Sequence, residues 1–277
     1  MKKGFIYIAN TEKFKSEALK SSKSLKRFTS YPICILLTND LIDDEINETF
    51  DDVIVNSELK NYTYFSKVIG MMNTPYDRTV FLDSDTFVCS DLDDLFDLLD
   101  YFDFSTTIEQ KKHTSKLNNL SLKNIFPEFN TGVIVFKKNK IMKSIFDDWL
   151  SISLESNIKM DMPFFREAVI KNIDKVNFSI LPDEYNLHGF STFLIIYGEV
   201  KVIHERLGRS LSTTTAFYPS FQQMELFEKK INKKNYKRLY IPKIGIIPYN
   251  YSPNKLITKV KKLMGVKRKS KHKFFKP

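Results

Sequence analysis

Short apolar runs alternate with amphipathic segments along most of this chain. The runs at Gly4–Ala9 and Pro32–Thr38 are almost continuously apolar, which is typical of strands buried on both faces. Between them, apolar residues recur at roughly helical spacing from Phe14 to Leu25, and Thr11 stands where a helix N-cap is expected. The pattern predicts a strand, a crossover helix and a second, parallel strand.

The same alternation continues to about residue 204. Further strands are predicted over residues 52–56, 79–82, 103–108, 130–136 and 200–203. Further helices are predicted over residues 63–72, 139–154 and 161–172. Strands that alternate with helices favour a mainly parallel central sheet, and ligands of such sheets bind beyond the carboxyl ends of the strands. The predicted fold class is therefore α/β.

Composition and motifs narrow the classes of function. Of the 277 residues, 42% are apolar and 27% are charged, so a sizeable core can form. No glycine-rich phosphate loop and no H-E-x-x-H, C-x-x-C or G-x-S-x-G motif occurs. No apolar run approaches the ~18 residues of a bilayer span, and the first run, which ends at Ala9, is shorter than a secretory signal requires. We expect a cytoplasmic protein in which Cys34 and Cys89 are free, buried thiols.

Charge divides the chain into an acidic body and a basic end. The formal net charge is +10, but residues 229–277 hold 17 of the 43 Lys and Arg residues and no acidic residue. The first 228 residues therefore carry 26 basic and 33 acidic residues. A nucleic-acid-binding domain, which is usually basic throughout, does not fit this distribution. We expect one domain over residues 1–250 and a basic tail over residues 251–277.

The tail pattern predicts a basic amphipathic helix. Ser252 and Pro253 suit its first turn, and apolar residues recur at helical spacing from Leu256 to Met264 among lysines. Such a helix can lie on an anionic membrane surface, where each cation contributes about 1 kcal/mol. A solvated tail, or a helix packed on the body, explains the same pattern.

Two aspartates directly follow one of the predicted strands. Asp83 and Asp85 come after the apolar run Thr79–Leu82, and alternate residues of an extended chain point the same way. Two converging carboxylates repel each other unless a cation lies between them, and their oxygens suit Mg²⁺ or Mn²⁺. An acidic surface turn is the alternative. For the nearby acids Asp91–Asp94 we expect a simpler role, in the first turn of a helix.

Two classes of metal enzyme place a D-x-D motif behind a strand. One is the haloacid-dehalogenase-like phosphatase, whose motif lies on the first strand and which carries a Gly-Asp motif downstream. Here several strands come first and no Gly-Asp dipeptide occurs, so this class is the alternative. The other class is the glycosyltransferases that use nucleotide sugars. A catalytically inactive nucleotide-sugar-binding module is a third candidate.

Seven short motifs, in order, resemble the A-type (GT-A) glycosyltransferases, in particular the nucleotide-diphospho-sugar transferases related to glycosyltransferase family 8. The resemblance covers roughly residues 4–209 and implies a single Rossmann-like domain. The motifs are Ile6–Asn10, Lys67 with Pro75–Arg78, Phe81–Thr86, Phe129–Val133, Asp161–Pro163, Leu181–Asn186 and Val202–His204.

The resemblance implies a role for each matching position. The metal ligands would be Asp83, Asp85 and His204, and an imidazole ligand favours Mn²⁺ over Mg²⁺. The catalytic residues would be Asp161 and Asn130, which hold the donor sugar. The cofactor-binding residues would be Ile8, Ala9, Asn10, Lys67, Asp83, Ser84, Asp85, Asn130, Thr131, Gly132, Asp161 and His204.

Each of these residues also has a purely structural explanation. Lys67 suits the solvated face of a helix, and Asn130–Gly132 suits a turn that enters a strand. Asp161 suits a helix N-cap with Pro163 behind it, and His204 can simply end an apolar strand.

The implied function is transfer of a sugar, with retention of its anomeric configuration, from a nucleoside-diphosphate sugar to a hydroxyl of a cell-surface or lipid-linked glycan. A UDP-sugar is the expected donor. The basic tail would then place the enzyme at the inner face of the cell membrane.

Two positions depart from the family pattern. Met162 stands where family members commonly carry Gln, and the spacing behind His204 differs, although Arg206 and Arg209 could still reach phosphate.

Overall fold

The computed structural model describes most of the first 204 residues and three later segments. The described residues are 1–61, 65–109, 122, 125–156, 158, 160–188, 194–204, 220–233, 238–241 and 245–248. The expected tail over residues 251–277, together with Arg206 and Arg209, lies outside them. Within the described part, no helix combines the length and the apolar character that a bilayer span requires.

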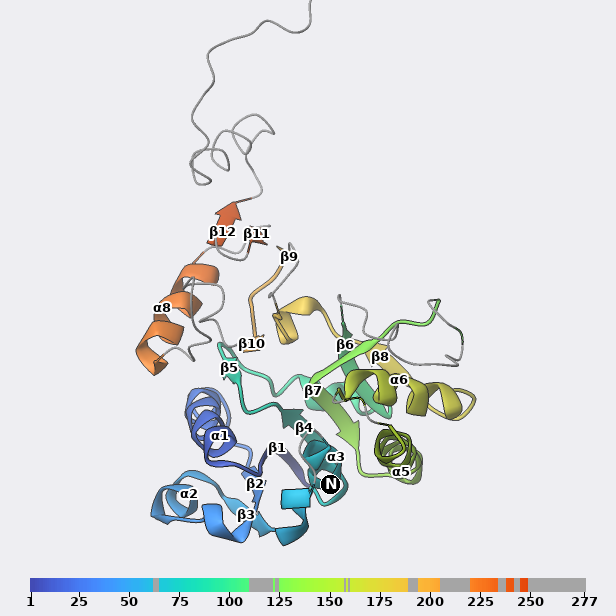
Figure 1. Cartoon of the computed structure of the whole chain (residues 1–277). Helices are drawn as coiled ribbons and strands as arrows, with labels where there is room; N and C mark the ends of the chain where they lie inside the picture. The colour runs from blue at the N-terminus through green and yellow to red at the C-terminus, as the bar shows by residue number, and fades with distance from the viewer. Residues whose placement is uncertain are drawn as a thin grey trace, which may run out of the picture.

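A seven-stranded sheet forms the centre of the molecule, in the order β3-β2-β1-β4-β7-β6-β8 (Figure 1). Four of its six neighbouring pairs are parallel, and β7 runs antiparallel to β4 and β6. The mainly parallel sheet of the prediction is thus confirmed. Its strands are β1 (Lys3–Ala9), β2 (Ile33–Leu37), β3 (Asp52–Val55), β4 (Arg78–Leu82), β6 (Phe104–Ile108), β7 (Phe129–Lys137) and β8 (Phe178–Ile180).

Helices cover both faces of this sheet (Figure 1). One face carries α1 (Glu12–Leu25), α2 (Asp44–Thr49) and α4 (Leu95–Leu98), and the other carries α3 (Ser66–Met72), α5 (Lys140–Leu154) and α6 (Met162–Lys171). The described residues also include short 3-10 turns, namely η1 (Asn39–Leu41), η2 (Ser57–Asn61) and η4 (Asp183–Tyr185).

Alternation along each strand divides the core between the two faces. In β1, Phe5 and Tyr7 pack on the α1 face, while Ile6 and Ile8 pack against α3 and α5. All four are almost completely buried, which is why the sequence shows a continuous apolar run rather than an alternating one.

A smaller antiparallel layer lies beyond the carboxyl ends of the parallel strands. There β5 (Thr86–Val88) pairs with β10 (Val202–His204). A separate three-stranded sheet contains β9 (Leu194–Ile196), β11 (Arg238–Ile241) and β12 (Gly245–Pro248). Helix α8 (Phe221–Ile231) starts with a capping box and buries Met224 and Phe227 in the same small core as Phe87 and Ile203. This layer supplies one wall of the site.

The predicted strands and helices of the central sheet are confirmed to within a few residues at each end. The sequence patterns did not reveal α2, α8 or the strands β5, β8, β9, β11 and β12, because most of these elements are too short to show a period. Both Cys34 and Cys89 are free and buried, as expected.

The expectation for the second acidic cluster is wrong. Asp91, Asp93 and Asp94 lie ahead of α4 instead of filling its first turn, and Asp94 provides no side-chain cap. Their carboxylates are used in other contacts: Asp93 accepts a hydrogen bond from Thr29 and Asp94 accepts one from Tyr185.

Candidate active site

The chain turns sharply just after β4. The backbone N–H and the hydroxyl of Thr86 both donate to the carbonyl oxygen of Asp83, at 3.1 and 2.8 Å. The Asp83 N–H in turn donates to the Gly132 carbonyl on β7, at 2.8 Å. The extended chain expected from Asp83 to Asp85 is therefore wrong, because Ser84 and Asp85 lie in a turn. A turn, rather than strand alternation, brings the two side chains together.

Helix α1 holds this turn through buried hydroxyl groups. Because Thr86 donates to the Asp83 carbonyl, Ser21 must donate to the Thr86 oxygen at 2.7 Å, and the Tyr7 hydroxyl must donate to Ser21 at 2.9 Å. Burial raises the pKa of Tyr7, so its hydroxyl stays protonated. The Ser84 hydroxyl donates to Glu17, also on α1, at 3.2 Å. These contacts fix the aspartate turn against α1 and β1.

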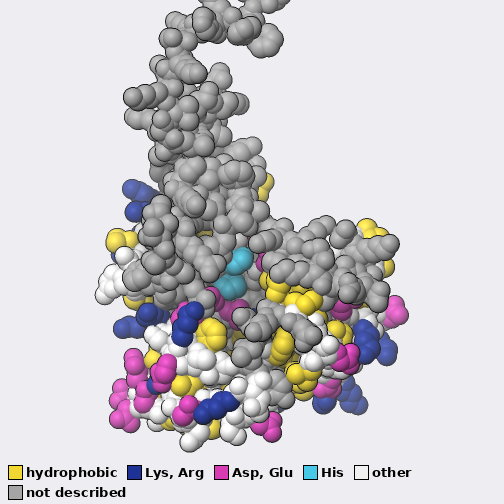
Figure 2. Space-filling model, viewed as in Figure 1, with side chains coloured by type: hydrophobic (Ala, Val, Ile, Leu, Met, Phe, Trp, Pro, Cys, Tyr) yellow, Lys and Arg dark blue, Asp and Glu magenta, His cyan; other side chains and the backbone are white. Residues whose placement is uncertain are grey.

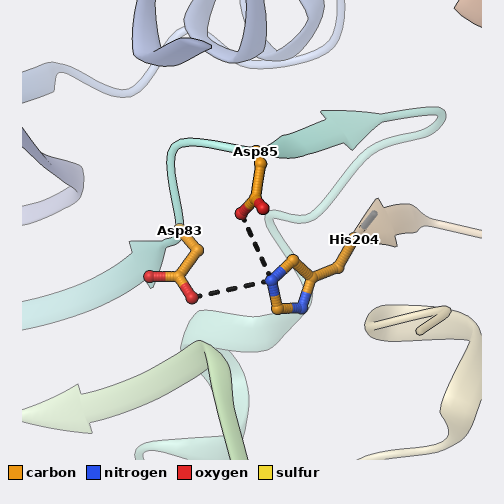
Figure 3. A group of neighbouring side chains, drawn as sticks. All are labelled: Asp83, Asp85 and His204. Carbon is orange, nitrogen blue, oxygen red and sulfur yellow. Dashed lines mark ion pairs between the residues drawn. The ribbon is translucent and has the colours of Figure 1, made fainter. Parts of the chain in front are cut away.

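Strand pairing places His204 opposite the turn. In the antiparallel pair of β5 and β10, His204 lies directly across from Thr86. Its Nε2 atom is 3.6 Å from Asp83 and 3.4 Å from Asp85, and both carboxylates point at the ring (Figure 3). These distances are long for hydrogen bonds but suit side chains arranged around a cation, because neighbouring ligand atoms of an octahedral ion lie about 3 Å apart.

These three side chains form a candidate metal centre. Their ligand atoms all lie within 4.8 Å of one another. Two carboxylate oxygens and one imidazole nitrogen form a donor set suited to Mn²⁺, so the residues fit the ion that the resemblance implies. Burial raises the pKa of Asp83, and Asp85 and Asp161 raise it further, while Lys67 and His204 oppose this shift. Burial alone would lower the pKa of His204, but Asp85 and Asp83 raise it above its usual value. The cluster therefore stabilises positive charge.

Lys67 connects the aspartate turn to the start of α6. Its Nζ atom lies 3.0 Å from Asp83 and 2.8 Å from Asp161. The Thr131 hydroxyl donates to the same Asp161 carboxylate at 2.5 Å. Burial would raise the pKa of Asp161, but Lys67 and Thr131 hold it below its usual value. Burial would lower the pKa of Lys67, but the two carboxylates raise it, so the lysine is charged.

Asp161 occupies the N-cap position of α6 without a side-chain cap. The capping role that its sequence position suggested is therefore wrong for the carboxylate. The Asp161 backbone carbonyl still accepts from Phe165, and also from the Trp149 indole at 3.1 Å. Its side chain is directed at Lys67 because a buried carboxylate gains more from a cation than from a backbone N–H.

A cleft of about 370 Å³ contains the centre. Its lining residues are Ile8, Lys13, Phe14, Ser66, Lys67, Phe81, Asp83, Ser84, Asp85, Asp161 and His204. Figure 2 shows histidine side chains beside acidic ones in a hollow on this face. Of the expected cofactor-binding residues at the end of β1, Ile8 lines the cleft, Ala9 is fully buried, and the Asn10 amide lies 3.4 Å from the Leu59 carbonyl.

Gly132 allows the imidazole to approach the sheet. A Cβ atom at this position would lie 2.1 Å from Cε1 and 2.3 Å from Nδ1 of His204, distances that real atoms do not adopt. Gly132 was expected among the cofactor-binding residues. In the structure its open side is occupied by the ring of His204.

The Asn130 side chain contacts neighbours other than Lys67 and the two aspartates. Its amide nitrogen donates to Glu109 at 2.7 Å, and it lines a small cavity with Glu109, Asn186 and His188. No sequence pattern assigns a role to Glu109 or His188, and Asn186 stands out in the sequence only as the last residue of a motif. The Leu181–Asn186 motif was the only available signal for that residue.

Comparison with known proteins finds structural neighbours but no match in sequence. No protein-family model matches the chain, and no curated protein matches its sequence. The glycosyltransferase GlyE of Streptococcus pneumoniae TIGR4 is 20% identical over 68% of this chain, with a TM-score of 0.48. The chain covers 47% of GlyE, about half its length.

Two further solved structures match over nearly their whole length. Mouse Xyloside xylosyltransferase 1 is 14% identical, with 74% of this chain and 98% of that chain covered and a TM-score of 0.50. Galactosyltransferase LgtC, solved with donor and acceptor sugar analogs, is 12% identical, with 92% and 99% covered and a TM-score of 0.52. The chain therefore has the fold of the A-type glycosyltransferases, as the order of its motifs predicted.

Proposed function

We propose that this protein is a metal-dependent glycosyltransferase that uses a nucleoside-diphosphate sugar as donor. The observation that carries the proposal is the convergence of Asp83, Asp85 and His204 in one cleft, at the edge of the sheet where α/β folds bind ligands. The glycosyltransferase fold gives that cluster its chemical context.

The three side chains would hold Mn²⁺ or Mg²⁺. A bound divalent ion would supply charge stabilisation for the diphosphate that leaves when the sugar is transferred. The hydroxyl contacts from α1 hold the aspartate turn, and burial holds His204, before any ion arrives, which reduces the reorganisation required on binding.

The neighbouring charged residues would complete the donor site. Lys67 reaches Asp83 and Asp161 and supplies a fixed cation beside the proposed position of the diphosphate. Asp161 and Thr131 would orient the donor sugar, and their mutual hydrogen bond fixes both side chains. Asn130 was expected to do the same, but its amide already binds Glu109 and Asn186, so we assign it a supporting position. Gly132 and Ser84 would shape the site.

The finer assignments follow the family resemblance. We propose UDP as the nucleotide, with the expected contacts near Ile8, Ala9 and Asn10, a glycan hydroxyl as acceptor, and retention of anomeric configuration. Met162 provides no amide beside the reacting carbon, so retention would proceed without help from that side chain. The domain over residues 1–250 would carry the reaction, and the tail over residues 251–277 would hold the enzyme on anionic lipid at the inner face of the membrane.

The test is removal of one carboxylate at a time. Asp83→Asn and Asp85→Asn are expected to abolish sugar transfer or UDP-sugar hydrolysis while leaving the melting temperature of the metal-free protein nearly unchanged. Asp91→Asn is the matched control, because Asp91 is an exposed residue in the second D-x-D motif. Near-normal turnover by either site variant in the presence of EDTA would contradict the metal role.

A ligand panel separates this proposal from its alternatives. UDP, GDP and CDP, each with and without Mn²⁺, are added to the full chain, and the melting temperature is recorded. A metal-dependent increase with one nucleotide identifies the donor class, because a ligand that binds only the folded state stabilises it. A haloacid-dehalogenase-like phosphatase would instead release phosphate from simple esters, and an inactive binding module would show the increase without turnover.

Liposome flotation, which compares the full chain with residues 1–250, tests whether the tail binds anionic lipid.

A further inference from the structure

A chain of buried amide groups connects Glu109 to the candidate metal centre. From Glu109 it passes through Asn130 and Asn186 to the Nδ1 atom of His204, and each link measures 2.7 to 2.9 Å. All four residues are at most 8% exposed. Buried amides are constrained to place donors opposite acceptors, so the chain allows each hydrogen to be located.

The orientation of Asn130 is fixed first. The Gly132 backbone N–H lies 2.9 Å from one terminal atom of its side chain, and a backbone N–H can only donate. That atom must be the amide oxygen. The amide nitrogen then faces Glu109, which accepts its hydrogen at 2.7 Å. Both ends of the Asn130 amide independently require the same orientation.

The orientation of Asn186 follows from that of Asn130. One terminal atom of Asn186 lies 2.8 Å from the Asn130 oxygen, so it must be the nitrogen, and it also lies 3.0 Å from the Thr107 hydroxyl. The other terminal atom is therefore the oxygen, which lies 2.9 Å from Nδ1 of His204. An amide oxygen can only accept, so Nδ1 must carry a hydrogen.

Strand pairing keeps Asn186 in this position. The residue after it, Leu187, forms a β-bridge with Ile203. The Leu187 N–H donates to the Val202 carbonyl at 2.8 Å, and the Leu187 carbonyl accepts from the His204 N–H at 3.0 Å. The amide and the imidazole are thus attached to two neighbouring backbone segments. Neither side chain can rotate away without breaking a buried hydrogen bond.

We infer that Asn186 is a positioning residue that sets the tautomer of His204. With hydrogen on Nδ1, a neutral ring directs the Nε2 lone pair at the space between Asp83 and Asp85. A hydrogen on Nε2 would instead be donated to the carboxylates and would block that space. A histidine that binds a metal usually donates its second N–H to such a partner, which raises its basicity as a ligand. The role of this tautomer in metal binding rests on the proposed function, whereas the hydrogen bonds that define the tautomer do not.

The first test reads the tautomer directly in the metal-free full chain. Histidine is labelled with ¹⁵N, and long-range ¹H–¹⁵N correlation spectra are recorded at a pH where the ring is neutral. His204→Ala identifies the signal among the four histidines. Wild type is expected to carry hydrogen on Nδ1, and Asn186→Leu is expected to move it toward Nε2. Hydrogen on Nε2 in wild type, or an unchanged tautomer in Asn186→Leu, would overturn the inference.

A second variant separates positioning from simple loss of structure. Asn186→Asp keeps an oxygen toward Nδ1 but places its other oxygen against the Asn130 oxygen, so it should lose stability and still keep the wild-type tautomer. Titration with MnCl₂ alone should show roughly 10- to 100-fold weaker binding by Asn186→Leu and a much smaller change for Asn186→Asp. Equal losses in both variants would indicate a structural role only and overturn the inference. Absence of Mn²⁺ binding in wild type would contradict the proposed function, while the spectra would still decide the tautomer.

Discussion

Replacing Gly132 with alanine tests whether the position of His204 controls metal binding. The added methyl group would lie 2.1 Å from Cε1 of the ring, whereas carbon atoms in contact lie about 3.5–4.0 Å apart. One of the two groups must therefore move by about 1.4 Å or more. Gly132 lies within β7 and its φ is outside the left-handed region, so alanine introduces no backbone strain there. The effect must act through the ring.

The size of the effect follows from the surroundings of the ring. His204 is 8% exposed and tied to Asn186 on Nδ1, so it has little space to relax. Overpacking of this kind lowers the free energy of unfolding by about 1–3 kcal/mol. Metal ligands tolerate displacements of about 0.2 Å, so Mn²⁺ affinity should fall at least about 10-fold. Urea unfolding and calorimetric titration with MnCl₂ measure the two quantities on the same protein.

A double-mutant cycle supplies the control. Once His204→Ala has removed the ring, the methyl group of Gly132→Ala has space, so the second substitution should change the stability of that variant by less than about 0.5 kcal/mol. Unchanged stability and unchanged Mn²⁺ affinity in the single Gly132→Ala variant would refute the reasoning.

Three further outcomes test other parts of the structure. Lys67→Met should lower the free energy of unfolding of the metal-free protein by about 1–3 kcal/mol in urea, because two partly buried carboxylates lose their cation, and an unchanged unfolding midpoint would contradict this. Burial raises the pKa of Cys34 to about 12 and the pKa of Cys89 well above its usual value, so iodoacetamide at pH 8 should modify both only after unfolding, as mass spectrometry can show. A hydrogen bond from Lys15 lowers the pKa of Asp43, so the stabilisation it provides is complete above the usual value of about 3.9 and is lost as pH falls through the lower folded value. Asp43→Asn should therefore melt below wild type at pH 7 and match it in strong acid, and a difference that persists in acid would contradict the assignment.

Sequence pattern was sufficient for the elements that carry the core. Strands such as β1 and β4 are buried on both faces, so their apolar runs are visible without any knowledge of their partners. The same local information located Asp83 and Asp85 at the end of a strand and gave the order of motifs from which the fold was predicted.

Sequence pattern failed where a residue serves a distant partner. Asp161 has the position of a helix cap, yet its carboxylate binds Lys67 and Thr131 from other elements. Asn130 has the pattern of a turn or a ligand, yet its amide lies within a buried hydrogen-bond chain. Local propensity cannot show this, because a buried polar group binds the partner that best compensates for its lost hydration, and that partner can lie anywhere in the chain.

By itself, the sequence of this protein determined most of the segments that form the sheet, which acids stand at its edge and that its two cysteines are buried. Only the tertiary structure decided that a turn after β4 joins the carboxylates, that the pairing of β5 with β10 brings His204 to them, and that Asn186 lies behind the ring. The physical reason is the distance along the chain over which each kind of information acts. Hydrophobic periodicity reports burial a few residues at a time, whereas the geometry of the site depends on strand register and hydrogen bonds between segments far apart in the chain.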